Sequence, residues 1–133
     1  MHMKELIDMA TNAREEAYAP YSRFAVGAAV LTSNGKIYTG CNIENSSYGL
    51  TNCAERTAIF KAVSEGDLSL ETMAVVADTP GPTAPCGACR QVMAEFGIKT
   101  VIMCNTRGDK KVITLAELLP FAFGDQDLSG DGK

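Results

Sequence analysis

Histidine is almost absent from this sequence of 133 residues, which contains only His2. A catalytic pair of serine or cysteine with histidine needs an imidazole inside the fold, and a residue at this position is expected to lie outside it. The scarcity therefore argues against hydrolases of the serine or cysteine type. A metal site in the interior would have to be built from cysteine and carboxylate side chains.

Long apolar runs are also missing, and none of those present could cross a bilayer. Residues 1–5 show no charged stretch followed by an apolar one, as a secretory signal would. We therefore expect a cytoplasmic protein without membrane contact. The length suits a single domain over residues 1–133, with the polar tail after about residue 124 loose at its end.

Basic clusters are absent as well, since lysine and arginine occur singly along a chain with a net charge of −4. Proteins that grip a nucleic acid backbone usually carry a basic patch, so we expect no polynucleotide partner. The five cysteines are Cys41, Cys53, Cys86, Cys89 and Cys104. An odd number without a secretory signal argues against a disulfide framework and favours metal binding, chemistry or packing.

The pattern of apolar residues predicts alternating helices and strands. Helices are expected over 4–17, 53–65 and 86–96, strands over 24–32, 37–40, 73–77, 100–104 and 111–113, and a last short helix after a Thr114–Glu117 capping box. The turn at 33–36 makes the first two strands an antiparallel hairpin, whereas strands separated by helices imply parallel neighbours. We expect an α/β fold, a single-domain three-layer α/β/α sandwich with a mixed five-stranded sheet.

Three cysteines are spaced as a metal site. Cys86 and Cys89 are three residues apart at the start of a predicted helix, so their sulfurs share a face, and Cys53 begins an earlier helix. Helix N-termini favour thiolates because of their free N–H groups and partial positive charge. If both helix starts meet, one Zn²⁺ per chain has three protein ligands and an open position, as in catalytic zinc sites.

Two charged residues follow Cys53 directly. Glu55 can lie over the open position and carry protons between water and a substrate. Three thiolates and Zn²⁺ sum to −1, which weakens the power of the metal to acidify water. Arg56 could compensate this charge by donating hydrogen bonds to a ligand sulfur. A surface arginine without such a role is the alternative interpretation.

The spacing of these residues resembles the motif of the zinc deaminases. Cys53-x-Glu55 followed by Pro85-Cys86-x-x-Cys89 is the three-cysteine form of their pattern. The stretches PYSRFAVGAAV, GCNIENSSYGLTNCAERTAIFKAVSEG, PCGACRQVMAEFG and ELLPFAFG resemble the cytidine deaminases that act on free nucleosides, over about residues 4–128. The resemblance implies zinc-dependent hydrolysis of cytidine and deoxycytidine to the uracil nucleosides and ammonia, in pyrimidine salvage, with Glu55 as the catalytic acid and base.

The same resemblance implies a set of substrate-binding residues. Asn42 and Glu44 would bind the ribose hydroxyls, and their spacing places both on the same side of an extended segment. Phe24 would pack against the pyrimidine, and the backbone N–H near Ala54 would contact the base edge. Phe123 and Tyr48 would reach the site of a neighbouring subunit, because the short chain is similar to the homotetrameric members of the family.

Other interpretations remain open. A structural zinc module closed by Cys41 or Cys104 would leave Glu55 without a role. A thiol redox protein would explain the C-x-x-C pair but not the third cysteine. A blasticidin-type deaminase would share length and motifs but act on a nucleoside antibiotic. A polynucleotide editor fits the acidic charge and the short chain least well.

Overall fold

The computed structural model describes residues 3–128 of the chain, so His2 lies outside the described residues, as does the end of the tail at 129–133. The strands are β1 (Val26–Thr32), β2 (Ile37–Cys41), β3 (Leu70–Ala77), β4 (Thr100–Asn105) and β5 (Lys110–Thr114). The helices are α1 (Met3–Ala13), α2 (Ala54–Ser64), α3 (Gly87–Glu95), α4 (Leu115–Leu118) and α5 (Asp125–Leu128), with 3-10 turns η1 (Arg14–Glu16) and η2 (Tyr48–Leu50).

The five strands form one mixed sheet in the order β2-β1-β3-β4-β5. Only β3 and β4 pair in parallel, while β1 is antiparallel to both β2 and β3. The expectation that strands separated by helices are parallel neighbours is therefore wrong for β2 and β3. These two strands do run in the same direction, as a crossover through α2 requires, but β1 is inserted between them.

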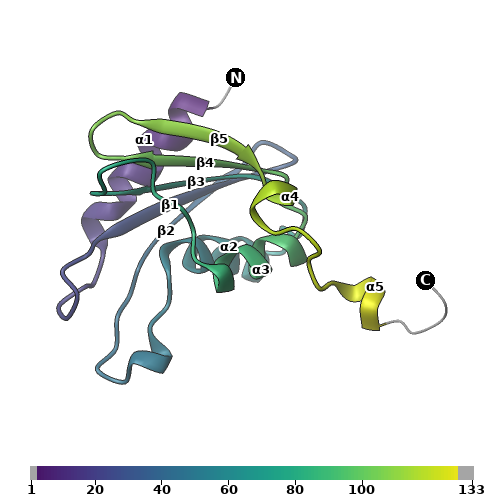
Figure 1. Cartoon of the computed structure of the whole chain (residues 1–133), viewed down its shortest axis with the longest axis horizontal. Coiled ribbons are helices and arrows are strands. Elements are labelled where there is room, and N and C mark those ends of the chain that lie inside the picture. Colours follow the sequence, from purple (N-terminus) through teal and green to yellow (C-terminus); the bar gives the residue numbers. More distant parts are fainter. Residues whose placement is uncertain (1–2, 129–133) are drawn as a thin grey trace.

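Helices cover both faces of the sheet, as predicted, with α1 on one face and α2 and α3 on the other (Figure 1). Two separate groups of buried side chains fill the spaces between the layers. One group joins Leu6 and Ala10 of α1 to alternate residues of β1, β3 and β4. The other joins α2 and α3 to the intervening residues of the same strands. Buried strands with two covered faces explain why their sequences are almost continuously apolar.

A glycine sets how closely α2 approaches the sheet. A Cβ atom on Gly40 of β2 would lie 2.4 Å from the backbone nitrogen of Ala58 and 2.7 Å from the carbonyl oxygen of Ala54. These atoms belong to the backbone of α2 and cannot move aside like a flexible side chain. The absence of a side chain at residue 40 thus fixes the depth of the helix that begins next to Cys53.

The first helix is shorter than the apolar pattern over 4–17 predicts. It ends at Ala13 and is followed by the single 3-10 turn η1. The chain then leaves the helical path because Tyr18 pairs with the segment after β2, with its N–H donating to Asn42 and its carbonyl accepting from Glu44. Tertiary hydrogen bonds thus override the local helical preference of the alanines.

The other boundaries differ little from those expected. β1 begins at Val26, which leaves Phe24 in the preceding loop. The Thr114–Glu117 capping box is confirmed at the start of α4. The sequence did not predict α5. Within residues 3–128, no helix combines the length and apolar character that crossing a bilayer requires.

Candidate active site

Two helix N-termini bring three cysteines together on one face of the sheet. Cys53 is the N-cap of α2 and Cys86 the N-cap of α3, both with extended backbone, and Cys89 lies in the first turn of α3. The sulfur atoms of the three residues all lie within 4.8 Å of one another. Free N–H groups at both helix starts stabilise negative charge on these sulfurs. The predicted convergence of the three cysteines is therefore what the structure shows.

The spacing of the sulfurs fits a zinc ion. The Cys53 and Cys86 sulfurs are 3.9 Å apart and the Cys86 and Cys89 sulfurs 3.5 Å apart. Zn–S bonds of about 2.3 Å in a tetrahedron require sulfur atoms about 3.8 Å apart. Among residues 3–128, no fourth cysteine, histidine or acidic residue completes the cluster. Cys104 instead packs in the core beneath α1, so it does not close the site.

The cluster has an uneven distribution of charge. A hydrogen bond from the Cys89 thiol, and beyond it the contact with Arg56, lowers the pKa of Cys53 to about 5. The same hydrogen bond, together with burial, raises the pKa of Cys89. Zinc would favour the deprotonated form of both, because thiolates and not thiols bind it.

Arg56 faces the cluster rather than solvent. Its terminal nitrogen Nη2 lies 3.2 Å from the sulfur of Cys53. The Nε of the same guanidinium is buried and lacks a hydrogen-bond partner in the described part of the chain. A cation held beside three sulfurs suits a site that carries excess negative charge.

Glu55 is buried next to the cysteines, with 4% of its surface exposed. Burial raises the pKa of its carboxyl to about 7, because the charged form loses its hydration. A carboxyl group with a pKa near neutrality can both accept and donate protons at physiological pH. The residue is therefore suited to general acid and base chemistry.

A cleft of about 240 Å³ opens beside these residues. Its walls come from the loop before β1, the segment after β2, the start of α2 and the loop before α3. The lining residues are Ser22, Phe24, Val26, Asn42, Glu44, Thr51, Cys53, Ala54, Glu55, Thr83, Ala84 and Cys86. The cleft thus joins Glu55 and two of the cysteines to Phe24, Asn42, Glu44 and Ala54, which the resemblance assigns to substrate binding.

Asn42 and Glu44 hold the chain segment that precedes β1. The side chain of Asn42 accepts from the N–H of Val26 at 2.9 Å and donates to the carbonyl of Phe24 at 2.7 Å. Glu44 accepts hydrogen bonds from the Ser22 hydroxyl and from the N–H of Tyr21 and of Ser22. Both side chains therefore orient the loop that carries Phe24 into the cleft.

Tyr48 and Phe123 do not line this cleft. Their side chains are 70% and 57% exposed. Tyr48 contacts the ring of Tyr21 edge to face, with the ring centroids 6.3 Å apart. Within one chain, neither residue therefore forms part of the wall of the cleft beside Glu55.

Sequence reasoning missed several residues of the cleft, among them Ser22, Thr51 and Thr83. Ser22 lies within the PYSRF stretch, and Thr83 lies three residues before a ligand cysteine. Their positions next to recognised motifs were the only available signal.

A second hollow of about 630 Å³ lies between the end of α3, α4 and residues 119–122. Its lining is mainly apolar, with Lys99 as its charged member. It contains neither Glu55 nor a cysteine, so the chemistry belongs to the smaller cleft.

Comparisons with known proteins agree on one family. The family model described as the cytidine and deoxycytidylate deaminase zinc-binding region matches residues 1–105. A cytidine deaminase of Sporosarcina psychrophila is 59% identical over 131 residues, covering 97% of this chain and 96% of the relative. A cytidine deaminase of Halalkalibacterium halodurans is 56% identical, covering 97% and 99% of the two chains.

Solved structures give the same result for the fold. The crystal structure of a cytidine deaminase from Burkholderia pseudomallei superposes with a TM-score of 0.89 at 54% identity, covering 92% of this chain and all of the other. A cytidine deaminase from Mycobacterium tuberculosis gives a TM-score of 0.79 at 43% identity, over 93% of this chain and 98% of the other. The α/β/α sandwich predicted from the sequence is thus confirmed.

Proposed function

Since the chain belongs to the cytidine and deoxycytidylate deaminase family, we propose that it hydrolyses cytidine and deoxycytidine to uridine and deoxyuridine with release of ammonia, in pyrimidine salvage. The observation that carries this proposal is the convergence of three cysteine sulfurs with the buried carboxyl of Glu55 at one cleft. The alternative of a structural zinc module would leave that carboxyl unused.

Cys53, Cys86 and Cys89 are the proposed ligands of one zinc ion per chain. When bound, Zn²⁺ supplies the Lewis acidity that allows water to react as a nucleophile near neutral pH. Arg56 offsets the negative charge of the three thiolates through its contact with Cys53.

Glu55 moves the protons of the reaction. Its carboxylate accepts a proton from the attacking water and gives it to ring nitrogen N3, as the oxygen adds to C4 of the pyrimidine. It then takes the proton of the new hydroxyl group and gives it to the amino nitrogen. The C4–N bond breaks, ammonia leaves and the carbonyl of the uracil base forms. One carboxyl with a pKa near 7 can serve in each of these steps.

The remaining residues of the cleft bind the nucleoside. Phe24 contacts the face of the pyrimidine, and the backbone N–H near Ala54 contacts the base edge. Asn42 and Glu44 bind the sugar hydroxyls with the hydrogen-bonding capacity that their contacts to the chain leave free. Their fixed orientation reduces the entropy lost on binding.

We further propose that the chain forms a homotetramer in which neighbouring subunits complete the sites. Large aromatic side chains that are exposed in one chain and do not reach its own cleft support this arrangement, Tyr48 and Phe123 above all. The apolar hollow beside α4 adds a second surface suited to a subunit contact.

We also propose a cytoplasmic location, which the proposed zinc site supports. All five cysteines are free thiols in the described structure. The ligand cysteines must remain reduced to bind metal, and the cytosol maintains reduced thiols.

The proposed activity can be tested by following the ultraviolet absorbance of cytidine with the purified protein. Parallel reactions contain deoxycytidine, cytosine, CMP and blasticidin S, each with and without a zinc chelator. We expect turnover of the two nucleosides and its loss after metal removal. Turnover of blasticidin S alone, or of no compound by the zinc-loaded protein, would contradict the proposal.

A further inference from the structure

The loop over residues 78–85 joins the end of β3 to the active site. It has no helix or strand, yet it supplies Thr83 and Ala84 to the wall of the cleft and leads directly to Cys86. An irregular segment that must hold a precise position needs hydrogen bonds from elsewhere in the fold.

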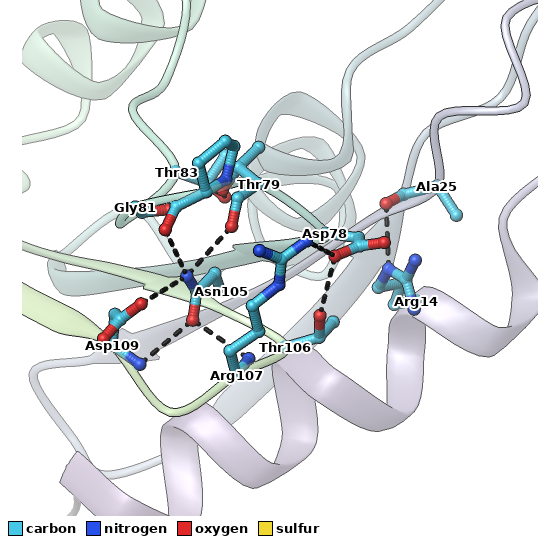
Figure 2. A network of polar contacts seen from close by, with 11 residues as sticks. Arg14, Ala25, Asp78, Thr79, Gly81, Thr83, Asn105, Thr106, Arg107 and Asp109 are labelled. Carbon is cyan, nitrogen blue, oxygen red and sulfur yellow. Dashed lines mark hydrogen bonds and ion pairs between the residues drawn. The ribbon is translucent and has the colours of Figure 1, made fainter.

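Asn105, the last residue of β4, supplies these hydrogen bonds from outside the cleft. Its side chain is buried, with 5% of its surface exposed. The amide nitrogen donates to the carbonyl of Thr79 at 2.9 Å and to a carboxylate oxygen of Asp109 at 2.8 Å. The amide oxygen accepts from the N–H of Arg107 and of Asp109, each at 3.0 Å. Figure 2 shows Asn105 between the loop on one side and the β4–β5 turn on the other.

The contact continues from Thr79 to the wall of the cleft. The hydroxyl groups of Thr79 and Thr83 lie 2.6 Å apart, and that of Thr79 also donates to the carbonyl of Gly81. The N–H of Thr83 donates to the carbonyl of Cys104, the residue before Asn105. Thr83 is thus tied to the end of β4 both by its own backbone and through Thr79.

We propose that Asn105 is a positioning residue of the deaminase site, which holds the Thr79–Thr83 loop segment so that Thr83 forms the wall against a bound nucleoside. This inference rests on the proposed function. Asn105 does not line the cleft itself, and it acts through the loop.

The position of the reacting groups does not depend on the same contacts. Glu55 lies in α2, and Cys53 is the N-cap of the same helix. The loop end next to Cys86 is fixed separately, because Arg90 of α3 donates to the carbonyl of Pro85 at 2.8 Å. Displacing the Thr79–Thr83 segment therefore loosens the wall of the cleft but leaves the carboxyl of Glu55 in place. Such a change weakens binding of substrate and transition state alike, and it raises KM with little change in kcat.

The test is Asn105→Asp, which keeps the size of the side chain and its acceptor oxygen. The carboxylate can still accept from the two N–H groups but cannot donate to Thr79, and it repels Asp109. We expect KM for cytidine to rise about 10-fold and kcat to change less than about 3-fold, with one zinc per chain retained. KM does not depend on the fraction of protein that is folded, so a purely structural role would lower kcat and leave KM unchanged.

A second variant removes the contact between Thr79 and Thr83 and leaves Asn105 unchanged. Thr79→Val removes the hydroxyl that contacts Thr83 and Gly81 but keeps the carbonyl that Asn105 binds. We expect it to raise KM as well, and it tests the inference if Asn105→Asp does not fold. The matched control is Asp78→Asn, which weakens the exposed ion pair with Arg107 in the same network (Figure 2) and should leave KM unchanged.

The outcomes separate this inference from the proposed function. If the wild-type enzyme deaminates cytidine and the folded variants keep its KM, Asn105 has no positioning role and the inference is overturned. An equal rise of KM in Asp78→Asn would also overturn it, because the effect would then not depend on the contacts among Asn105, Thr79 and Thr83. If the wild-type enzyme itself does not deaminate cytidine, the proposed function fails first.

Discussion

The guanidinium of Arg56 lies 3.2 Å from the sulfur of Cys53, so a permanent positive charge contacts one of the three clustered thiols. Hydrogen bonds to charged groups contribute more to stability than neutral ones, and this one opposes the net charge of −1 expected for three thiolates around Zn²⁺. The contact also joins Arg56 to Cys53, the two residues on either side of Glu55 in the motif. The electrostatics of the site are therefore built into one turn of α2.

Replacing Arg56 with glutamine should weaken this compensation. We expect zinc affinity to fall by about 10-fold or more and turnover of the zinc-loaded enzyme to decrease, because the site becomes more negative. Zinc affinity is measured by competition with a chromophoric chelator. Lys61→Gln makes the same charge change at an exposed position of α2 and should alter neither quantity. If Arg56→Gln and Lys61→Gln have the same zinc affinity and the same turnover, Arg56 does not compensate the charge of the thiolates.

Each of the three clustered cysteines should be required for metal binding. We expect Cys53→Ala, Cys86→Ala and Cys89→Ala to lose the bound zinc and to unfold at lower temperature, because metal binding is coupled to folding. Cys104→Ala is the matched control, since it removes a buried thiol that packs beneath α1 and should keep one zinc per chain. Metal analysis and thermal denaturation provide the readouts, and a zinc-free Cys104→Ala protein would argue against three ligands.

Gly40→Ala should displace the helix that carries the site. The added Cβ would meet backbone atoms of α2 at 2.4 and 2.7 Å, so the helix must move away from β2. We expect a loss of at least about 2 kcal/mol in the free energy of unfolding, together with weaker zinc retention. Gly49→Ala adds the same methyl group where no atom lies within 4 Å, and it should change little. Denaturant unfolding of both variants measures the difference.

Much of the site could be predicted from the sequence because its parts are local. Cys86 and Cys89 face the same way by helical geometry, and Glu55 follows Cys53 by two residues. The strands predicted over 24–32 and 73–77 correspond to β1 and β3, whose apolar residues pack on both faces of the sheet. Such features depend on neighbouring residues and on repeated backbone geometry, which a single sequence contains.

The features of the fold and the site that could not be predicted depend on contacts between residues far apart in the sequence. Nothing in the sequence indicates that β1 is inserted between β2 and β3, because strand order is fixed by packing across the whole sheet. The hydrogen bond between Asn105 and Thr79 joins two residues that are 26 positions apart and of ordinary polar types. The oligomeric state stays a prediction from resemblance.

The contact between Glu44 and Ser22 should make stability depend on pH. The hydroxyl of Ser22, with the N–H groups of Tyr21 and Ser22, lowers the pKa of Glu44 below its usual value of 4.5. A carboxyl whose pKa is lower in the folded state stabilises the fold above the unfolded pKa, and this contribution is lost as the pH falls through the folded pKa. We expect wild type to be more stable than Glu44→Gln near neutral pH, with the difference shrinking below about pH 4.5. Thermal unfolding of both proteins across this range is the measurement, and a difference that grows on acidification would contradict the assignment.

The central claim is that three cysteines hold zinc while the carboxyl of Glu55 moves protons at the same cleft. Glu55→Gln tests it most directly, because the amide preserves the size of the side chain but cannot accept a proton from water and donate it to the substrate. We expect the variant to retain one zinc per chain and the wild-type fold, and to lose at least about 100-fold in kcat for cytidine. A zinc-loaded Glu55→Gln enzyme that keeps most of the wild-type turnover would contradict the account.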